Sequence, residues 1–427
     1  MRQKVSRLRA PLISIRSIHP VAPAIAAAGL LSLVVPIAEA SGPPVGTNGW
    51  TADVAANPVF TDNFSGTTLD TTKWNYRTDQ YKAGLQSVQL PANVSVNNGL
   101  VITLLKQVTP NVPTCSGCTT TVTQNYTGGG IVSKQAFRYG YYETSGQINP
   151  TTGWHSSFWF QEDGGDGSNT YTPARRTEID AFEIDSGAPT YIRHNVFEWY
   201  PPFVNTGELT SNIYQYPNFT GGGSFSTGYH TYGVDWEEGS VSYYVDGNLM
   251  YSTTYLPSWD TNDYINIWLS TVATNYPTAA SDHSNWAYAT YWQKDYYSDY
   301  NDAGTGYAEV TGTWSTSSLL GWTKGYKSRY ATCGTAGNTA TWTPTILNAG
   351  NYNVYYYNIV NANSDPNMSL NVAGQTTMVD GTTGTTGWVL LTAAPIAVPV
   401  GSATTVTLTS SGSGCARAEN VKFVRVN

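Results

Sequence analysis

Apolar and polar residues alternate along much of this chain. The alternation is clear in segments such as 94–105, 130–137, 240–245 and 353–359. Because successive side chains of a β-strand point to opposite faces, a period of two predicts half-buried strands. Gly, Asn, Asp and Pro interrupt these segments at short intervals, and no stretch after the N-terminal region has the spacing of an amphipathic helix of normal length. The pattern predicts an all-β protein built from sandwiches.

The length of the chain favours two domains, because 427 residues exceed the usual size of one. Residues 300–306 (YNDAGTG) are polar and contain two glycines, which is typical of a domain boundary. We therefore predict a larger domain over residues 50–300 and a smaller β-sandwich domain over residues 306–427.

The N-terminal region has the features of a signal peptide. Residues 21–37 are apolar apart from one serine, and residues 38–40 (AEA) form a small-x-small cleavage site before Ser41. We predict that residues 1–40 are removed and that the protein is secreted, with no membrane attachment afterwards. A membrane anchor is the alternative, but the apolar run is short and contains two prolines. The basic residues that precede the run are Arg2, Lys4, Arg7, Arg9 and Arg16.

The charge balance narrows the class of partner. Charged residues make up only 12% of the chain, and the formal net charge is −8. Without residues 1–40, the chain keeps 16 of its 21 basic and 28 of its 29 acidic residues, a formal charge of −12. This acidity argues against nucleic acid or anionic lipid as a partner. The 31 Tyr and 14 Trp residues fit both sheet cores and stacking on sugar rings, and we expect a monomer that acts on a polysaccharide.

The four cysteines predict two disulfides in an exported protein, Cys115–Cys118 and Cys333–Cys415. Zinc binding and redox activity are the alternatives for the first pair, which forms a C-x-x-C motif. No second close pair or histidine cluster is present to complete four zinc ligands, and no strand-then-helix pattern surrounds the motif.

The most informative segment is residues 177–185 (TEIDAFEID), in which acidic and apolar residues alternate. On a strand, Glu178 and Asp180 share one face. Strict alternation would turn Glu183 to the opposite face, but a β-bulge at residues 181–182 would bring it back. We therefore predict that three carboxylates line one surface.

Such a row suits glycoside hydrolysis. In a cleft, the repulsion between neighbouring carboxylates separates their pKa values. A retaining glycosidase needs one ionised carboxylate as nucleophile and one protonated carboxyl as acid, roughly 5–5.5 Å apart. A solvated acidic strand face and a calcium site are the alternatives, although calcium prefers ligands from loops with glycine turns.

The segments around this row resemble family 16 glycoside hydrolases, in the version whose catalytic strand carries the bulge. The resemblance extends from residue 56 to about residue 298, and its motifs occur in the family's order. The matching residues are Phe60, Asp62, Phe64, Leu69, Asp70, Trp74, 91–94 (PANV), 98–100 (NGL), 126–134 (YTGGGIVSK), 137–140 (FRYG), 153–159 (GWHSSFW), His230, Tyr232, Asp235, Trp236 and 244–247 (YVDG).

The resemblance implies a concanavalin-like β-jelly-roll sandwich with a substrate groove across its concave face. It implies that Glu178 is the nucleophile, that Glu183 is the general acid/base, and that Asp180 hydrogen-bonds to the nucleophile. The predicted protein is a secreted, endo-acting, retaining β-glycanase that works by double displacement. A transglycosylase on the same substrate and a noncatalytic lectin or adhesin are the alternatives. The substrate is predicted to be a β-1,3-glucan or a galactan.

The resemblance also implies substrate-binding residues. Among the three tryptophans we expect one to be a core residue, and the histidine is either a substrate contact or a sheet histidine. The implied residues are Asn93, Trp154, Trp159, His194 and Trp236. Residues 289–293 (ATYWQ) depart from the family's usual final strand, whose aspartate lies near a structural calcium. We therefore predict no cofactor and no metal-binding residues, with a structural calcium in doubt.

The last 120 residues resemble the golvesin-type C-terminal domain, a β-sandwich similar to carbohydrate-binding modules. The resemblance implies either a sugar-binding module or a structural spacer. The matching segments are 309–315 (EVTGTWS), 328–330 (SRY), 340–344 (ATWTP), 350–355 (GNYNVY) and 418–424 (AENVKFV).

Overall fold

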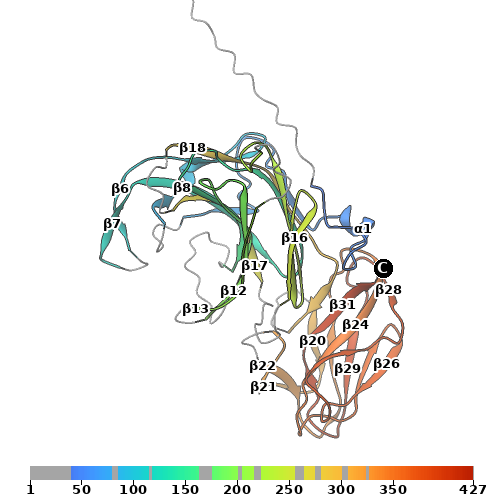
Figure 1. The fold of residues 1–427 in the computed structure, drawn as a ribbon. Helices are drawn as coiled ribbons and strands as arrows, with labels where there is room; N and C mark the ends of the chain where they lie inside the picture. The colour runs from blue at the N-terminus through green and yellow to red at the C-terminus, as the bar shows by residue number, and fades with distance from the viewer. Residues whose placement is uncertain are drawn as a thin grey trace, which may run out of the picture. The chain divides into compact units, whose positions relative to one another are not determined.

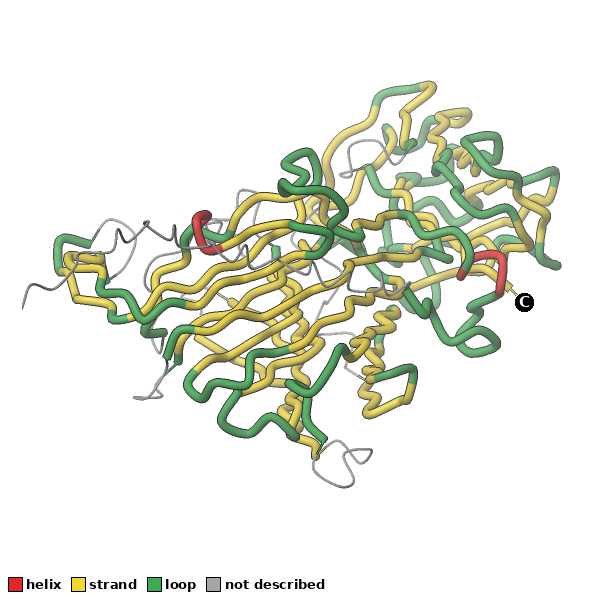
Figure 2. Tube along the Cα trace, turned by 90° about the horizontal axis from the view of Figure 1, so that it is seen from above, coloured by secondary structure: helices red, strands yellow, loops and turns green. Residues whose placement is uncertain are grey.

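The computed structural model is built almost entirely from β-strands (Figures 1 and 2). The regular helices in the described residues are short: α1 (Ala52–Ala55) and the 3-10 turn η1 (Pro91–Asn93). None of these is long and apolar enough to cross a membrane. The prediction of an all-β protein is confirmed. The structure describes residues 40–78, 85–114, 118–162, 176–200, 204–215, 223–254, 264–274, 280–300, 306–323 and 327–426, and the predicted signal peptide lies outside them up to residue 39.

The described residues between 60 and 292 form two facing sheets whose strand pairs are antiparallel, apart from β3, which runs parallel to β8. The first, which we call the back sheet, has the order β16-β15-β14-β9-β18-β5-β4, with β1 paired to β18. Its strands are β1 (Phe60–Asp62), β4 (Val94–Val96), β5 (Leu100–Leu104), β9 (Gly140–Gln147), β14 (His230–Glu237), β15 (Ser240–Val245), β16 (Asn248–Thr254) and β18 (Asp282–Trp292).

The second, which we call the front sheet, has the order β13-β12-β11-β10-β17-β8-β2, with β3 paired to β8. A small hairpin, β6 (Thr109–Pro113) with β7 (Thr121–Gln124), stands apart from both sheets (Figure 1). The front-sheet strands are β2 (Trp74–Tyr76), β3 (Ser87–Gln89), β8 (Tyr126–Phe137), β10 (Trp154–Gln161), β11 (Arg176–Asp185), β12 (Tyr191–Tyr200), β13 (Val204–Gln215) and β17 (Ile265–Ala273).

A single hydrophobic core fills the space between the back and front sheets. Phe158 and Phe182 enter it from the front sheet, and Trp286 enters it from the back sheet. Phe182 stacks on Trp286 with ring centroids 5.8 Å apart. Because each strand turns one side chain in two toward this core, the alternation in the sequence becomes the two-layer arrangement predicted as a jelly roll.

The C-terminal strands enclose a core of their own, with Trp342, Tyr356 and Phe423 among its buried residues. The predicted Cys333–Cys415 disulfide is present, whereas Cys115 of the other predicted pair lies outside the described residues. The sheets have the orders β19-β31-β24-β27 with β28 on β24, β20-β23-β29-β25-β26, and β21-β22-β30. The strands are β19 (Tyr296–Ser298), β20 (Tyr307–Thr311), β21 (Trp314–Leu320), β22 (Lys327–Ala331), β23 (Ala336–Trp342), β24 (Gly350–Asn358), β25 (Met368–Val372), β26 (Gln375–Val379), β27 (Gly387–Leu390), β28 (Ile396–Val398), β29 (Val406–Ser411), β30 (Arg417–Ala418) and β31 (Val421–Val426).

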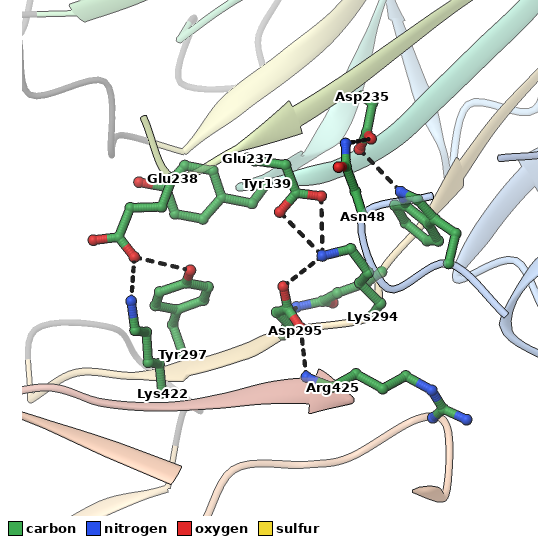
Figure 3. A network of polar contacts seen from close by, with 12 residues as sticks. Asn48, Tyr139, Asp235, Glu237, Glu238, Lys294, Asp295, Tyr297, Lys422 and Arg425 are labelled. Atoms are coloured by element: carbon green, nitrogen blue, oxygen red, sulfur yellow. Dashed lines mark hydrogen bonds and ion pairs between the residues drawn. The ribbon is translucent and has the colours of Figure 1, made fainter. Parts of the chain in front are cut away.

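A network of polar contacts joins the turn after β14 to strand β31 (Figure 3). Glu238 accepts hydrogen bonds from Lys422 Nζ at 2.6 Å and from Trp388 Nε1 at 2.7 Å. Asp295 accepts one from Lys294 Nζ at 2.7 Å and one from the backbone N–H of Arg425 at 2.8 Å. These contacts connect the two sandwiches directly.

Candidate active site

Strand β11 contains the bulge that the sequence predicts. Across from β10, Phe182 pairs with Phe158 and Asp180 pairs with Trp159, so Ala181 is an extra residue without a partner. The register with β12 also shifts between Asp180 and Glu183. The extra residue turns Glu183 back to the face that carries Glu178 and Asp180.

These three carboxylates line one pocket of about 200 Å³ on the outer face of the front sheet. The pocket therefore brings the predicted acidic residues together, and it adds side chains from neighbouring elements. The described lining residues are Arg77, Leu85, His155, Ser157, Trp159, Glu178, Asp180, Glu183 and Val272.

Strand β10 supplies a hydrogen-bonding partner to each end of the acidic row. Gln161 lies opposite Glu178 and His155 lies opposite Asp185. The buried amide of Gln161 donates from Nε2 to Glu178 Oε2. This hydrogen bond fixes the orientation of the Glu178 carboxylate.

Glu183 is held by side chains from two strands. His155 Nε2 lies 3.1 Å from Glu183 Oε1, and Asn195 Nδ2 donates to Glu183 Oε2 at 3.0 Å. Arg193 Nη1 lies 3.9 Å from Glu183 Oε2. On its other ring nitrogen, Nδ1, His155 contacts Asp185 Oδ1 at 2.9 Å. His155 thus bridges two carboxylates.

The pKa values within the row differ in direction. Burial, followed by the negative charges of Glu183 and Glu178, raises the pKa of Asp180 well above its ordinary value. Burial also acts to raise the pKa of Glu183, but the hydrogen bond and charge of His155, with the charge of Arg193, outweigh it and lower the pKa.

For His155, the two contributions to the pKa act in the opposite directions. Burial acts to lower its pKa, but the hydrogen bonds to Asp185 and Glu183 outweigh burial and raise the pKa to about 9. Within the acidic row, the pKa values of the two carboxyls are therefore shifted in opposite directions, up for Asp180 and down for Glu183. The direction for Glu183 is the reverse of that expected for a carboxyl that stays protonated.

Trp159 is the predicted aromatic residue that reaches the pocket. It is 8% exposed, and its ring stacks on Trp268 with centroids 4.7 Å apart. The guanidinium carbon of Arg77 lies 5.5 Å from the Trp159 ring and 5.7 Å from the Trp268 ring. This stack fixes the orientation of Trp159 beside the carboxylates.

The other two predicted tryptophans do not reach the pocket, which corrects their assignment as sugar-stacking residues. Trp154 is fully buried, with its ring against Tyr126. Trp236 is fully buried in the back sheet, where its ring packs on Tyr139 at 4.9 Å. A ring with no exposed surface cannot stack on a substrate, so both residues belong to the core.

His194 and Asn93 are also corrected, because both are buried away from the pocket. His194 stacks on Tyr243 at 4.5 Å, and burial lowers its pKa to about 4, so the imidazole is neutral. The Asn93 side-chain amide donates to Thr103 O at 2.8 Å and to Thr127 Oγ1 at 3.0 Å. Both side chains support the sheets.

The residues that the sequence analysis missed lie on the carboxylate face of neighbouring strands. His155 and Gln161 share a face of β10, and Arg193 and Asn195 share a face of β12. The same alternation that identified the acidic row could have indicated them once the strands were paired. Within the described ranges, no group of three or more His, Cys, Asp or Glu residues is arranged to hold a metal ion.

Comparison with known proteins identifies the family. The sequence profile of the β-porphyranase A–D domain of glycoside hydrolase family 16 matches residues 55–300, which is more than half of the chain. The chain belongs to glycoside hydrolase family 16. Behind this family 16 domain, the profile of the golvesin C-terminal domain matches residues 298–425.

Two relatives whose names denote different activities align to the family 16 domain. Glucan endo-1,3-beta-glucosidase A1 of Niallia circulans is 27% identical over 256 residues, which cover 56% of this chain and 34% of that protein. Beta-porphyranase B of Zobellia galactanivorans is 27% identical over 226 residues, covering 50% of this chain and 72% of that protein. This chain thus spans about a third of the first relative's length.

Among solved structures, the laminarinase catalytic domain of Thermotoga maritima MSB8 has 17% sequence identity and a TM-score of 0.45. The alignment covers 56% of this chain and 98% of that one.

Proposed function

We propose that the family 16 domain is an endo-acting β-glycanase that hydrolyses internal bonds of a polysaccharide with retention of configuration. The observation that carries this proposal is the bulged strand β11, which places Glu178, Asp180 and Glu183 in one pocket. A retaining mechanism needs a nucleophile and an acid/base that flank the scissile bond, roughly 5–5.5 Å apart.

In the first step, the ionised Glu178 attacks the anomeric carbon while Glu183 gives a proton to the departing glycosidic oxygen. Gln161 holds Glu178 in place through its amide. Because the pKa of Glu183 is lowered and that of His155 is raised to about 9, the proton that Glu183 gives comes from His155, whose Nε2 lies 3.1 Å from Glu183 Oε1. Asp185 holds the imidazole ring from the other side.

In the second step, a water molecule attacks the glycosyl–Glu178 ester and gives its proton to Glu183, which returns it to His155. The net change is the addition of one water across the glycosidic bond. Burial and the acidic neighbours raise the pKa of Asp180, and in its protonated form this carboxyl can donate a hydrogen bond to an adjacent carboxylate. His155 acts through Glu183 and is therefore a positioning residue.

For the substrate, we propose a porphyran-type galactan first and a β-1,3-glucan second. The matching family profile is named for β-porphyranases, and one aligned relative is named a glucan endo-1,3-beta-glucosidase. We further propose that the protein is secreted after removal of residues 1–40, as the N-terminal pattern predicts.

The test is product analysis with the mature two-domain protein on porphyran, agarose, carrageenan, laminarin and mixed-linkage glucan. Short oligosaccharides from one polymer are expected, together with a rapid fall in viscosity. Glu178→Gln is the matched control, because it keeps the shape of the side chain and removes the nucleophile. We expect it to lower turnover on the order of 10⁴-fold while it leaves the thermal midpoint unchanged. Near-normal turnover in this variant contradicts the mechanism, and release from none of the polymers favours a lectin.

A further inference from the structure

Residue 143 of strand β9 is a buried carboxylate on the outer face of the back sheet. Glu143 is only 1% exposed, and it shares this face with Tyr141. Transfer of a charged carboxylate into such a site is costly unless a cation pairs with it. Burial accordingly raises the pKa of Glu143.

The donors to Glu143 in the described part of the chain are all neutral. Ser41 contributes two, its backbone N–H at 2.7 Å from Oε1 and its hydroxyl at 2.7 Å from Oε2. Tyr288 donates to Oε1 at 2.6 Å and Tyr141 to Oε2 at 3.3 Å, and the Gly42 N–H lies 3.5 Å from Oε1. No Lys, Arg or His side chain contacts this carboxylate among the residues that the structure describes.

The segment that brings Ser41 to this site is part of the folded domain. Trp50 is fully buried and donates from Nε1 to Asp235 Oδ1 at 3.0 Å, and Asn48 donates to the other oxygen of Asp235 at 2.9 Å (Figure 3). Trp50 packs with Tyr141 and Trp292 in a small cluster on the outer face. Ser41 therefore belongs to a segment, residues 41–50, that packs on the outer face of the back sheet.

The sequence places the predicted signal-peptide cleavage at the bond before Ser41. We propose that hydrolysis of the Ala40–Ser41 bond creates an α-ammonium group on Ser41, which forms an ion pair with the buried carboxylate of Glu143 and fastens the mature N-terminus to the back sheet. Water adds its hydroxyl to the Ala40 carbonyl carbon, and the Ser41 nitrogen, released as an amine, takes a proton from solvent.

The geometry for this pair exists before cleavage, because the Ser41 nitrogen already lies 2.7 Å from Glu143 Oε1. Cleavage turns a neutral amide donor into a cationic one without requiring the nitrogen to move. Hydrogen bonds to charged partners are shorter and stronger than neutral ones. Before cleavage, the described residues offer Glu143 neutral donors only, so processing and stability are linked. This inference does not depend on the sugar that the pocket binds.

The first test is the N-terminal sequence of the protein purified from the culture medium of an exporting host. A protein that begins at Ser41 is expected, and a different first residue overturns the proposal. The second test compares two full-length mature proteins, one that begins at Ser41 and one that keeps Ala40 as a single added residue. Both are made with Glu143 and with Glu143→Gln, and their thermal midpoints are measured without substrate.

We expect the added residue to lower the midpoint by about 3–6 °C when Glu143 is present and by less than about 1 °C in the Glu143→Gln pair. Equal midpoints of the two Glu143 proteins, or the same difference in both pairs, overturn the proposal.

If Glu143→Gln does not fold, acetylation of the α-amine by acetic anhydride replaces it as the test. The Ser41 amine is expected to react at least tenfold more slowly in the native protein than in urea. An equal rate in both conditions overturns the ion pair.

Discussion

The histidine at position 155 contacts a carboxylate with each of its ring nitrogens, Asp185 at 2.9 Å and Glu183 at 3.1 Å. This arrangement keeps the imidazole protonated well above its ordinary range, with a pKa of about 9. At neutral pH, the proton that the proposed mechanism requires is therefore held next to Glu183. In that proposal the pair, and not Glu183 alone, is the acid of the site.

We predict that His155→Asn lowers kcat by about 10–100-fold and moves the alkaline limb of the kcat–pH profile to lower pH. The sign follows from the proton balance, because His155 holds its proton until the pH rises through about 9 and the variant loses that store. The measurement is kcat from pH 5 to 10 on the polymer identified by product analysis.

His283→Asn serves as the control for this experiment, because His283 is exposed and pairs only loosely with Asp282, at 3.7 Å. Its profile should match that of the unmodified protein. An unchanged alkaline limb in His155→Asn contradicts the role of His155 as proton store. A merely structural role would lower activity equally at every pH.

Asp185→Asn tests the contact between Asp185 and the Nδ1 atom of His155. Loss of the carboxylate removes one of the two contacts that raise the pKa of His155, so the alkaline limb should move to lower pH by a smaller amount than in His155→Asn. We expect kcat at pH 6 to fall less than about tenfold. A shift larger than that of His155→Asn would contradict the proposal that Asp185 acts on Glu183 through His155.

At this scale, the sequence was informative about residues within one strand. The spacing of Glu178, Asp180 and Glu183 was enough to predict a shared face and the bulge that it requires. His155 and Gln161 depend on the pairing between β10 and β11, which no single strand reveals. Trp154 and Trp159 are five positions apart in β10, so they lie on opposite faces of the strand. This spacing could have shown that Trp154 faces the core when Trp159 faces the pocket.

Among the elements, β8 shows how closely two strands of the front sheet approach. A Cβ atom added to Gly128 would lie 2.4 Å from Thr271 O, and one added to Gly130 would lie 2.6 Å from Leu269 O. Both acceptors are backbone atoms of β17, the strand that supports β10. The glycines therefore allow the packing on which the pocket is built.

We predict that Gly128→Ala lowers the free energy of unfolding by about 2 kcal/mol or more, because the backbone of β17 cannot yield without losing its pairing. Urea unfolding followed by tryptophan fluorescence measures the change. Gly228→Ala is the matched control, since nothing lies within 4 Å of a Cβ at that position. Equal stability of the two variants would show that the strands can separate freely.

The strands themselves were largely predictable, and their order was not. Alternation located segments such as 240–245, which coincides with β15 (Ser240–Val245). Strand β9 pairs with β14 and β18, which follow it by many residues, and such distant pairing leaves no local signal. The order came only from the family resemblance. His194 is a second example. Its place in a strand was predictable, but the face on which it lies, opposite to that of Arg193 and Asn195, depends on how β12 pairs with β11.

For the whole molecule, the contact between the sandwiches depends strongly on Glu238. This carboxylate accepts hydrogen bonds from Lys422 and Trp388, and it also lies within 3.3 Å of Trp322 Nε1. Strand β19 precedes the boundary predicted at residues 300–306, yet it pairs with β31 of the C-terminal sheet. The chain thus crosses between the sandwiches before its polar linker.

We predict that the mature protein unfolds in one calorimetric transition and that Glu238→Ala separates or broadens it, because four donors lose their acceptor. Glu309→Ala is the control, since Glu309 pairs with Arg329 inside the C-terminal domain. A single, unshifted transition in Glu238→Ala would show that the contact contributes nothing to cooperation between the domains.

The extra residue in β11 also has a genetic consequence. Loss of the Ala181 codon, three nucleotides, keeps the reading frame and leaves every acidic residue of the strand encoded. Asp180 and Glu183 would then stand two residues apart, so that regular alternation would keep all three carboxylates on one face. The same acidic face can therefore be encoded by a strand with or without the extra residue, and loss of this one codon is not expected by itself to remove the acidic row.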